Sequence, residues 1–481
     1  MSLLDEQLRQ RHPWWFGRGM EDDLHLRRLD RSHVKWDPAP LLAMHLKFED
    51  THTLRGPRQA GKTTTLKRMI RRLVEAGETR IFYVSFDLPQ DASAIVEAVR
   101  AAKRLHPNPK GPWYLFFDEI TAIADWQLGV KAAWDSGLTA DDALLLTASS
   151  AHDLKRGAER LPGRRGQGKD YLQLPMSFRD YCTAMHAVHF DDEPIAAEEF
   201  LSARGEGVAA RLVSQGAVLR EAFAGYLRVG GFPAATNDVL QRPDRTVSSE
   251  TLHMLWDIIS GDISHSQRDR TAALKLLQAV GESLGSPLSW LGASRAMGVA
   301  SPHTSQDYVE FLSEMFTLLT VFYWDIGAHS LEPRKQRKLY LLDPLLAQIP
   351  RALIPVTALP GEDGLVECVV AGGLFRAAAQ TLIQASALPG AVGYWRSSNE
   401  REIDFMIPCV TDLERPRLPI EVKGDNATGL SNARSAIKSR FKQGLVLSRN
   451  VFDWRSDVAT IPAWAFLAGL SERPQRTITF G

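Results

Sequence analysis

A phosphate-binding loop is the clearest chemical signal in the sequence. Gly56, Gly61, Lys62 and Thr63 match the pattern G-x-x-x-x-G-K-[ST] at every fixed position. Glycines let backbone N–H groups approach phosphate oxygens, and a following helix N-terminus adds partial positive charge. Lys62 would bridge the β- and γ-phosphates of ATP, and Thr63 would hold Mg²⁺. The nucleotide-binding residues predicted here are Gly56, Pro57, Arg58, Gln59, Ala60, Gly61, Lys62, Thr63 and Thr64.

Two acidic residues at the end of a second apolar strand complete the pattern of an ATPase site. Residues 113–117 form a continuous apolar run, typical of a strand buried on both faces, and lead into Asp118 and Glu119. Asp118 would reach the Mg²⁺ ion, and Glu119 would orient or polarise the attacking water. The two motifs together predict phosphoryl transfer from ATP to water.

A third buried strand supplies candidate hydroxyl groups. Residues 143–146 are apolar and lead into Thr147 and Ser149. With this strand between the two earlier ones, either hydroxyl could sense the γ-phosphate, and Thr147 is included among the predicted nucleotide-binding residues. An ordinary strand-to-helix turn with a serine cap explains the same pattern, so that alternative stays open.

A basic turn precedes the next expected strand, residues 171–174. Residues 155–169 hold six Lys and Arg side chains and one acid. Arg164 is the candidate arginine finger, which would complete the ATP site of a neighbouring subunit in a homo-oligomer, and Arg165 is the alternative. The same turn could instead contact a nucleic-acid backbone or remain a solvated loop.

A second set of chemical residues lies near the C-terminus. Residues 400–407 and 418–423 alternate polar and apolar side chains, as half-buried strands do. If these strands are neighbours, Asp404, Glu421 and Lys423 converge. Two close carboxylates repel each other unless a cation lies between them. The pattern therefore predicts a Mg²⁺ site with a lysine that positions or activates water.

The Asp…Glu-x-Lys pattern resembles that of restriction-endonuclease-like nucleases, written PD-(D/E)XK. Upstream, Glu367 lies in a helical run and resembles the helix glutamate that such nucleases add as a third metal ligand. Downstream, residues 431–442 carry four Lys and Arg side chains and no acid, and could face a phosphate backbone. Glu-x-Lys alone is a weak signal, so an active nuclease and an inert nuclease-like fold both remain open.

The elements that must position these residues belong to a multidomain globular protein. The 481 residues are 44% hydrophobic and 24% charged, which is ordinary globular composition. The 57 basic and 57 acidic residues cancel, which excludes a histone-like coat of positive charge. The three cysteines lie far apart and indicate neither a disulfide framework nor a zinc ribbon.

A winged helix-turn-helix is suggested between residues 288 and 342. Helices are expected at 288–297 and 304–315, followed by a basic wing at 334–338. The second helix carries three acids and no Lys or Arg, whereas major-groove reading requires basic and amide side chains. We therefore favour a packing module between domains, although the wing could still touch a phosphate.

Several further segments match one family of proteins. They are Arg55–Thr64, Asp118–Ile120 with Trp126, Leu145–Ser150, Gly163-Arg164, Pro175–Phe178 and Tyr226–Pro233. With them the chain resembles a widespread prokaryotic family of AAA-type P-loop ATPases that carry a nuclease-like C-terminal domain. Ala148 departs from that family, which usually has glycine there.

The resemblance implies an α/β fold of four parts. These are an AAA-type P-loop ATPase core (1–180), a helical lid of net charge −5 (181–270), a winged helix (271–350) and a restriction-endonuclease-like α/β domain (351–481). The expected metal ligands are Thr63, Asp118, Glu367, Asp404 and Glu421, and the expected catalytic residues are Lys62, Glu119, Arg164, Asp404, Glu421 and Lys423.

The expected function is an ATPase coupled to a nuclease-like domain that acts on or senses DNA. The alternative is a nucleotide-switched regulator whose nuclease-like domain is inert and binds a protein partner. DNA contacts would be confined to the basic turns, because the total charge is zero. Residues 1–15 contain no apolar segment typical of a signal peptide, and no apolar run is long enough to span a bilayer. A cytoplasmic protein without membrane contact is therefore expected.

Overall fold

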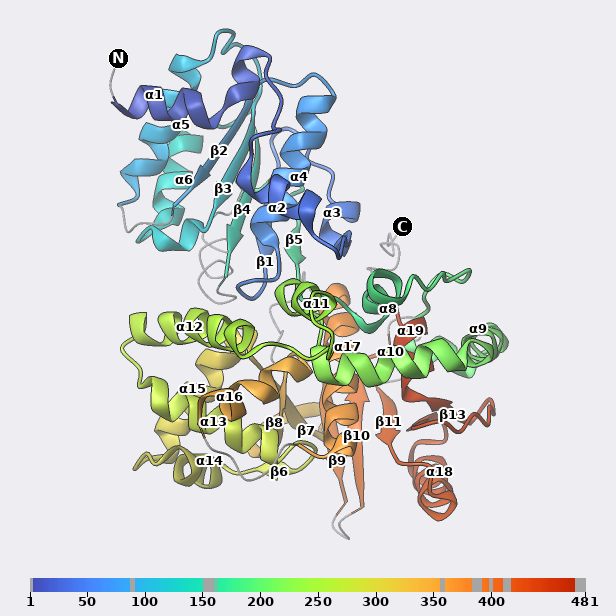
Figure 1. Cartoon of the computed structure of the whole chain (residues 1–481). Helices are drawn as coiled ribbons and strands as arrows, with labels where there is room; N and C mark the ends of the chain where they lie inside the picture. Colours follow the sequence, from blue (N-terminus) through green and yellow to red (C-terminus); the bar gives the residue numbers. More distant parts are fainter. Residues whose placement is uncertain are drawn as a thin grey trace. The chain divides into compact units, whose positions relative to one another are not determined.

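The computed structural model describes residues 3–86, 91–149, 161, 163–354, 360–382, 392–397, 401–409 and 417–471 (Figure 1). The chain forms two compact units, Met1–Leu174 and Pro175–Gly481. The boundary lies just before the one expected at residue 180, and the second unit contains all three segments predicted after it. No helix among the described residues has the length and apolar character needed to cross a bilayer.

A parallel sheet of five strands forms the centre of the first unit, in the order β2-β3-β4-β1-β5. Because β4 lies between β1 and β3, the expected position of the third strand is confirmed. The C-terminal ends of parallel strands meet at one edge of a sheet, so the candidate ATPase residues are brought together there. The strands are β1 (Thr51–Arg55), β2 (Ile81–Ser85), β3 (Tyr114–Asp118), β4 (Ala143–Ala148) and β5 (Asp170–Leu172).

Helices flank this sheet (Figure 1). Helix α4 begins directly after the phosphate loop, and α2 packs against it, while α5 packs against both α1 and α6. The elements are α1 (Leu3–Arg11), η1 (Pro13–Phe16), α2 (Leu24–Arg31), α3 (Ala39–Ala43), α4 (Lys62–Glu75), α5 (Ser93–Leu105), η2 (Ile120–Ala122) and α6 (Trp126–Asp135).

A buried histidine ties the N-terminal segment to the edge strand β2. His12 stacks on Trp15 with 4.3 Å between ring centroids, and its Nδ1 lies 2.6 Å from the carbonyl oxygen of Leu8. Its Nε2 accepts a hydrogen bond from the backbone N–H of Tyr83 at 3.1 Å. The Trp15 indole donates to the carbonyl of Ile81 at 2.8 Å. The segment is thereby fixed beside Tyr83, whose hydroxyl donates to Asp118.

The free energy that holds the N-terminal segment against β2 should depend on pH through His12. Burial lowers the pKa of His12 from 6.5 to about 4. The unfolded chain therefore gains a proton at a higher pH than the folded chain, so the stabilisation present above pH 6.5 is lost as the pH falls towards 4. We expect a loss of roughly 2 kcal/mol between pH 6.5 and about pH 5. Replacing His12 by glutamine should remove this dependence.

Hydrogen–deuterium exchange of the β2 amides measures this effect. The free energy of opening would be compared at two pH values in the parent and in His12→Gln, after correction for intrinsic exchange. The parent should lose protection at low pH by more than the variant does. The same pH dependence in both proteins would contradict the assignment.

Helices make up the first part of the second unit. The region predicted as a helical lid is mostly helical among its described residues, and the boundary expected at residue 181 falls inside a helix, α8. The elements are α8 (Phe178–His186), η3 (Ala197–Leu201), α9 (Ala203–Ser214), α10 (Gly216–Val229), α11 (Pro233–Leu240), α12 (Ser249–His265), α13 (Arg270–Glu282), α14 (Trp290–Met297) and α15 (Pro302–Glu314).

One mixed sheet of eight strands runs through the rest of this unit, in the order β13-β12-β11-β10-β9-β7-β8-β6. The parallel pair β7–β9 joins the hairpin of the predicted winged helix to the strands of the predicted nuclease-like domain. The boundary expected at residue 350 therefore does not separate two sheets. The strands are β6 (Pro287–Leu288), β7 (Leu318–Asp325), β8 (Ser330–Leu341), β9 (Gly393–Arg396), β10 (Glu402–Ile407), β11 (Leu418–Val422), β12 (Gly444–Ser448) and β13 (Val458–Pro462).

Helices pack beside this sheet. Helix α17 contacts β8 and β10, and α18 contacts β11, β12 and β13. The remaining elements are η4 (Pro344–Gln348), α16 (Ile349–Leu353), α17 (Glu362–Leu382), α18 (Ala427–Phe441) and α19 (Ala463–Gly469).

The segment Tyr226–Pro233, one of the segments by which the sequence resembles the ATPase family, has a structural role. Asp343, buried after β8, accepts a hydrogen bond from the N–H of Gly231 at 2.8 Å. Gly230 has a φ of 67°, and a Cβ there would lie 1.9 Å from a carboxylate oxygen of Asp343. Glycine is therefore required at this position for both conformation and space. The segment anchors α10 to the end of β8.

Candidate functional site

The phosphate loop forms the turn from β1 to α4, as the sequence predicted. Helix α4 starts at Lys62, and its N-cap residue Gly61 has a φ of 87°. Gly56 passes so close to β5 that a Cβ would lie 1.9 Å from the carbonyl oxygen of Gln173. The loop backbone and the N-terminus of α4 therefore form a shape suited to an anion. Within the loop, Arg58 and Gln59 are exposed and Pro57 is buried.

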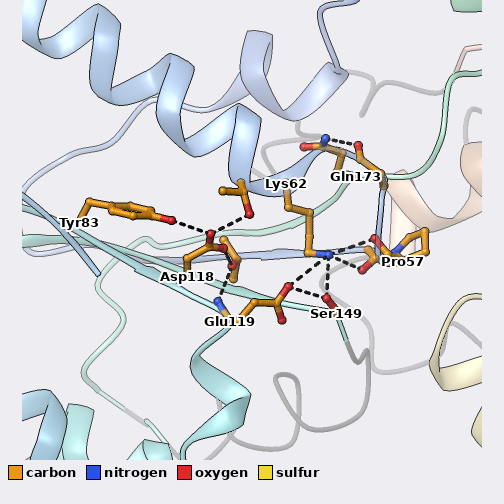
Figure 2. A network of polar contacts seen from close by, with 11 residues as sticks. Pro57, Lys62, Tyr83, Asp118, Glu119, Ser149 and Gln173 are labelled. Carbon is orange, nitrogen blue, oxygen red and sulfur yellow. Dashed lines mark hydrogen bonds and ion pairs between the residues drawn. The ribbon is translucent and has the colours of Figure 1, made fainter. Parts of the chain in front are cut away.

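Lys62 lies folded back over the loop. Its Nζ donates to the carbonyl oxygens of Gly56 at 2.9 Å and Pro57 at 3.0 Å, and to Ser149 Oγ at 3.1 Å (Figure 2). The side chain is 5% exposed, so the ammonium is held in a site largely shielded from water. All three acceptors are oxygen atoms, the type of partner that a phosphate also offers.

Asp118 is the centre of the second part of the site. One carboxylate oxygen accepts from Thr63 Oγ1 at 2.8 Å and from the Tyr83 hydroxyl at 3.1 Å, and the other accepts from Thr147 Oγ1 (Figure 2). The helix hydroxyl and the strand carboxylate are thus adjacent, as the predicted Mg²⁺ ligands must be. A hydroxyl and a carboxylate are hard oxygen donors that suit Mg²⁺. Thr63 and Asp118 therefore fit the predicted ion.

Glu119 and Ser149 link this carboxylate region to Lys62. Ser149 Oγ donates to Glu119 Oε1 at 2.6 Å while it accepts from Lys62, and Glu119 Oε1 lies 3.9 Å from Lys62 Nζ. Thr147 instead accepts from the Glu119 N–H at 3.0 Å and donates to Asp118. Of the two hydroxyls considered from the sequence, Ser149 faces the lysine and Thr147 positions the acidic pair. Ser150 lies outside the described residues.

Two residues of this network were missed by the sequence reasoning. Gln173, directly after β5, donates through Nε2 to the carbonyl of Ala60 at 2.6 Å and accepts from Thr65 Oγ1 at 2.8 Å. Tyr83, on β2, bonds Asp118. Neither residue belongs to a sequence motif, since one is a single glutamine after a strand and the other a single tyrosine within a strand. Both could have been predicted only from their position near the C-terminal edge of the parallel sheet, where the other site residues lie.

Two cations of the basic turn, Arg164 and Arg165, are paired with acids of their own unit. Arg164 makes two hydrogen bonds to the Asp135 carboxylate, at 2.6 and 3.1 Å, and Arg165 Nη2 lies 2.6 Å from Asp170 Oδ1. Residues 155–160 of the turn lie outside the described residues. The role of Arg164 as an arginine finger remains a prediction.

The predicted C-terminal residues do converge. Strands β10 and β11 are antiparallel neighbours, so Asp404 and Glu421 lie side by side, each 5% exposed. The Asp404 N–H donates to Glu421 Oε2 at 3.1 Å, and Lys423 Nζ lies 2.6 Å from Glu421 Oε1. Glu367 on α17 joins them through Lys338, a residue that the sequence analysis placed in an exposed wing.

Lys338 is fully buried in β8 and its ammonium lies among three carboxylates. Nζ is 2.6 Å from Glu402 Oε1, 2.8 Å from Asp404 Oδ1 and 3.2 Å from Glu367 Oε1. The expected wing at 334–338 is therefore wrong for its last two residues, because β8 extends to residue 341 and its C-terminal part is buried from residue 337 onwards. Among the described residues, no group of three or more His, Cys, Asp or Glu is arranged to hold a metal ion.

The electrostatics of this cluster favour a charged lysine. Burial alone would lower the pKa of Lys338, but the charges of Asp404, Glu367 and Glu402 outweigh it and raise that pKa. Burial, together with the charge of Asp404, raises the pKa of Glu421 well above its usual range. With a lysine already present, the carboxylates do not fit the Mg²⁺ ion predicted for Glu367, Asp404 and Glu421.

The basic segment after strands β10 and β11 is partly neutralised. It forms most of α18, where Arg434 Nη1 lies 2.5 Å from Asp453 Oδ2 and Lys438 Nζ lies 2.6 Å from Asp457 Oδ2. Both acids come from the segment between β12 and β13. Two of the four cations predicted to face a phosphate backbone are therefore paired.

Two segments of the chain match known protein families, and one of these families has a described domain type. Residues 49–182 match a family model described as an AAA domain, and residues 220–356 match one described as a domain of unknown function. No curated protein matches the chain.

Solved structures show distant likenesses. A Walker-type ATPase of Pyrococcus abyssi is 13% identical, with a TM-score of 0.36 over 70% of this chain and 99% of that one. The Aeropyrum pernix Orc1 protein, solved in complex with DNA, is 16% identical, with a TM-score of 0.27 over 69% and 92%. Cdc6p from Pyrobaculum aerophilum is 11% identical, with a TM-score of 0.25 over 63% and 86%. At such TM-scores the likenesses do not establish a shared fold.

The family match covers the strands and loops that carry every residue of the site around Lys62 and Asp118. The strand order and the position of the phosphate loop agree with that match. Residues 49–182 of the chain therefore form an AAA domain with a P-loop.

Proposed function

We propose that the first unit binds ATP with Mg²⁺ and hydrolyses it. The observation that carries this proposal is the continuous network from Lys62 through Ser149 to Glu119, beside the pair Thr63–Asp118. A γ-phosphate would take the place of the oxygen atoms that Lys62 now contacts. Glu119 would then orient the attacking water, with Ser149 fixing its carboxylate.

Mg²⁺ held by Thr63 and Asp118 would neutralise charge on the phosphates. The residues of the chain prepare this arrangement. Tyr83 and Thr147 hold the two oxygens of Asp118, and Gln173 holds the loop at Ala60. Such preorganised donors are a major source of catalysis, because they need no rearrangement during the reaction.

Release of phosphate from ATP by the full chain tests this proposal. Hydrolysis should require Mg²⁺ and stop in EDTA. Duplex and single-stranded DNA would be added in parallel, to test whether a nucleic acid changes the rate. A purified, folded chain that hydrolyses no ATP above background with Mg²⁺ would contradict it.

A second candidate function is a nucleotide-dependent regulator with a nuclease-like C-terminal fold that does not act on DNA. The order α17–β9–β10–β11–α18–β12, with Asp404 and Glu421 on adjacent strands, supports the nuclease-like interpretation. The pairing of Arg434 and Lys438 with acids, and the lack of Lys or Arg on α15, favour a regulator over a DNA-processing enzyme. An ATPase rate that DNA leaves unchanged, with nucleotide-dependent capture of a protein partner, would support it. A marked stimulation by DNA would contradict it.

A further inference from the structure

Lys338 bridges parts of the second unit that are distant in the sequence. It lies on β8, whereas its partners Glu402 and Asp404 lie on β10 and Glu367 lies on α17. Strands β7 and β9 separate β8 from β10 in the sheet order, so no backbone pairing links them. The pairing of β10 with β9 is irregular between residues 403 and 406, where Asp404 lies. Irregularities of this type redirect side chains, and this one accompanies the contact with Lys338.

The ammonium group of Lys338 can donate one hydrogen bond to each of the three carboxylates around it. A lysine has three N–H donors, and Lys338 has three carboxylate partners at 2.6, 2.8 and 3.2 Å. Tyr340, two residues further along β8, donates its hydroxyl to Glu367. The same strand therefore supplies both a cation and a hydrogen-bond donor to the carboxylates.

The carboxylate oxygens that a metal would need already have donors. Asp404 Oδ1 contacts Lys338, and Oδ2 accepts from the N–H of Val422 at 2.9 Å. Glu421 Oε1 contacts Lys423, and Oε2 accepts from the N–H of Asp404. Each of the four oxygens of this pair thus has an N–H partner. The Asp118 oxygens accept from hydroxyl groups, whereas here the ammonium of Lys338 lies among the carboxylates, and its positive charge would repel Mg²⁺.

We propose that Lys338 takes the place of the divalent cation in the C-terminal cluster, so that this site folds without metal and does not cleave phosphodiester bonds. The cluster then serves to fix the β7–β8 hairpin against α17 and β10. The inference concerns only the second unit and does not depend on ATP hydrolysis by the first.

Binding of Mn²⁺ to the nucleotide-free full chain tests the proposal. Free Mn²⁺ would be followed by electron paramagnetic resonance for the parent, Asp404→Asn and Lys338→Met. Any weak binding near Thr63 and Asp118 is common to all three proteins. The parent and Asp404→Asn should bind equal amounts. Lys338→Met should gain one Mn²⁺ per chain, and a Lys338→Met/Asp404→Asn double variant should lose that gain.

Lys335→Met is the matched control, because Lys335 lies on the same strand but half of its side chain is exposed. It removes the same charge and should gain no Mn²⁺. If Lys338→Met does not fold, the parent decides the question. A parent that binds one more Mn²⁺ than Asp404→Asn, or that cuts DNA with Mn²⁺ in a manner lost in Asp404→Asn, would overturn the proposal. A melting temperature of the parent that neither EDTA nor Mn²⁺ changes would support it.

Discussion

Replacing Lys62 by alanine should lower the rate of ATP hydrolysis by about two to three orders of magnitude, the effect of removing one donor from a preorganised site. The ammonium is positioned by Gly56, Pro57 and Ser149, and no other Lys or Arg lies in the phosphate loop except the exposed Arg58. Alanine leaves the backbone of the loop intact, so the main loss is a charge-assisted contact to phosphate.

The variant should fold like the parent, because alanine keeps the helix start at this position and the lysine contacts described above all lie within the phosphate loop and the neighbouring strand ends. Lys131→Ala is the control, since Lys131 is an exposed lysine on α6. Phosphate release at saturating ATP and thermal melting would be measured for all three proteins. A Lys62→Ala rate equal to that of the parent would contradict the assignment of Lys62 as a phosphate-binding residue.

The parts of the site that could be predicted from the sequence are those formed by contiguous residues. Gly56 to Thr63 specify a loop and a helix start by themselves, because glycine conformations and the helix N-terminus are local properties. Asp118 and Glu119 follow a short continuous apolar run, which is typical of a strand buried on both faces. The parallel order of those strands then brings the two motifs together without further information.

The choice between Thr147 and Ser149 required the structure. The two residues are two positions apart, so the alternation of side chains along a strand would place them on the same face of the sheet. Strand β4 ends at Ala148, so Ser149 leaves the alternation and turns towards Lys62, while Thr147 stays beside Asp118. A one-residue difference in where a strand ends cannot be read from composition.

Lys338 shows a second limit of sequence reasoning. Within the run at 334–338 it has four basic or polar neighbours, and such a run usually forms a solvated surface. Its carboxylate partners lie on α17 and β10, at least 29 residues further along the chain. Similarly, the acids that pair with Arg434 and Lys438 follow α18 in the sequence, so the charge of residues 431–442 alone did not include them. Charge balance in the fold is a tertiary property, whereas the sequence showed only local charge.

Replacing Glu119 by glutamine should produce a protein that retains ATP but hydrolyses it slowly. The amide keeps the size of the side chain and an oxygen that can accept from Ser149, so the network around Lys62 should persist. It cannot act as a base or carry the negative charge that orients water. Removal of a general base typically lowers a rate by about two to four orders of magnitude.

The decisive feature is the contrast with Lys62→Ala. Glu119→Gln should bind ATP at least as tightly as the parent, because it keeps the phosphate contacts and removes a carboxylate that lies 3.9 Å from Lys62 and would repel the γ-phosphate. Lys62→Ala should bind ATP more weakly and also hydrolyse it more slowly. Filter binding of radiolabelled ATP and single-turnover hydrolysis would separate the two, with Glu97→Gln, an exposed change on α5, as the control. If Glu119→Gln turned over ATP at the parental rate, water activation would have to come from another residue of the network, and Ser149 would be the first to examine.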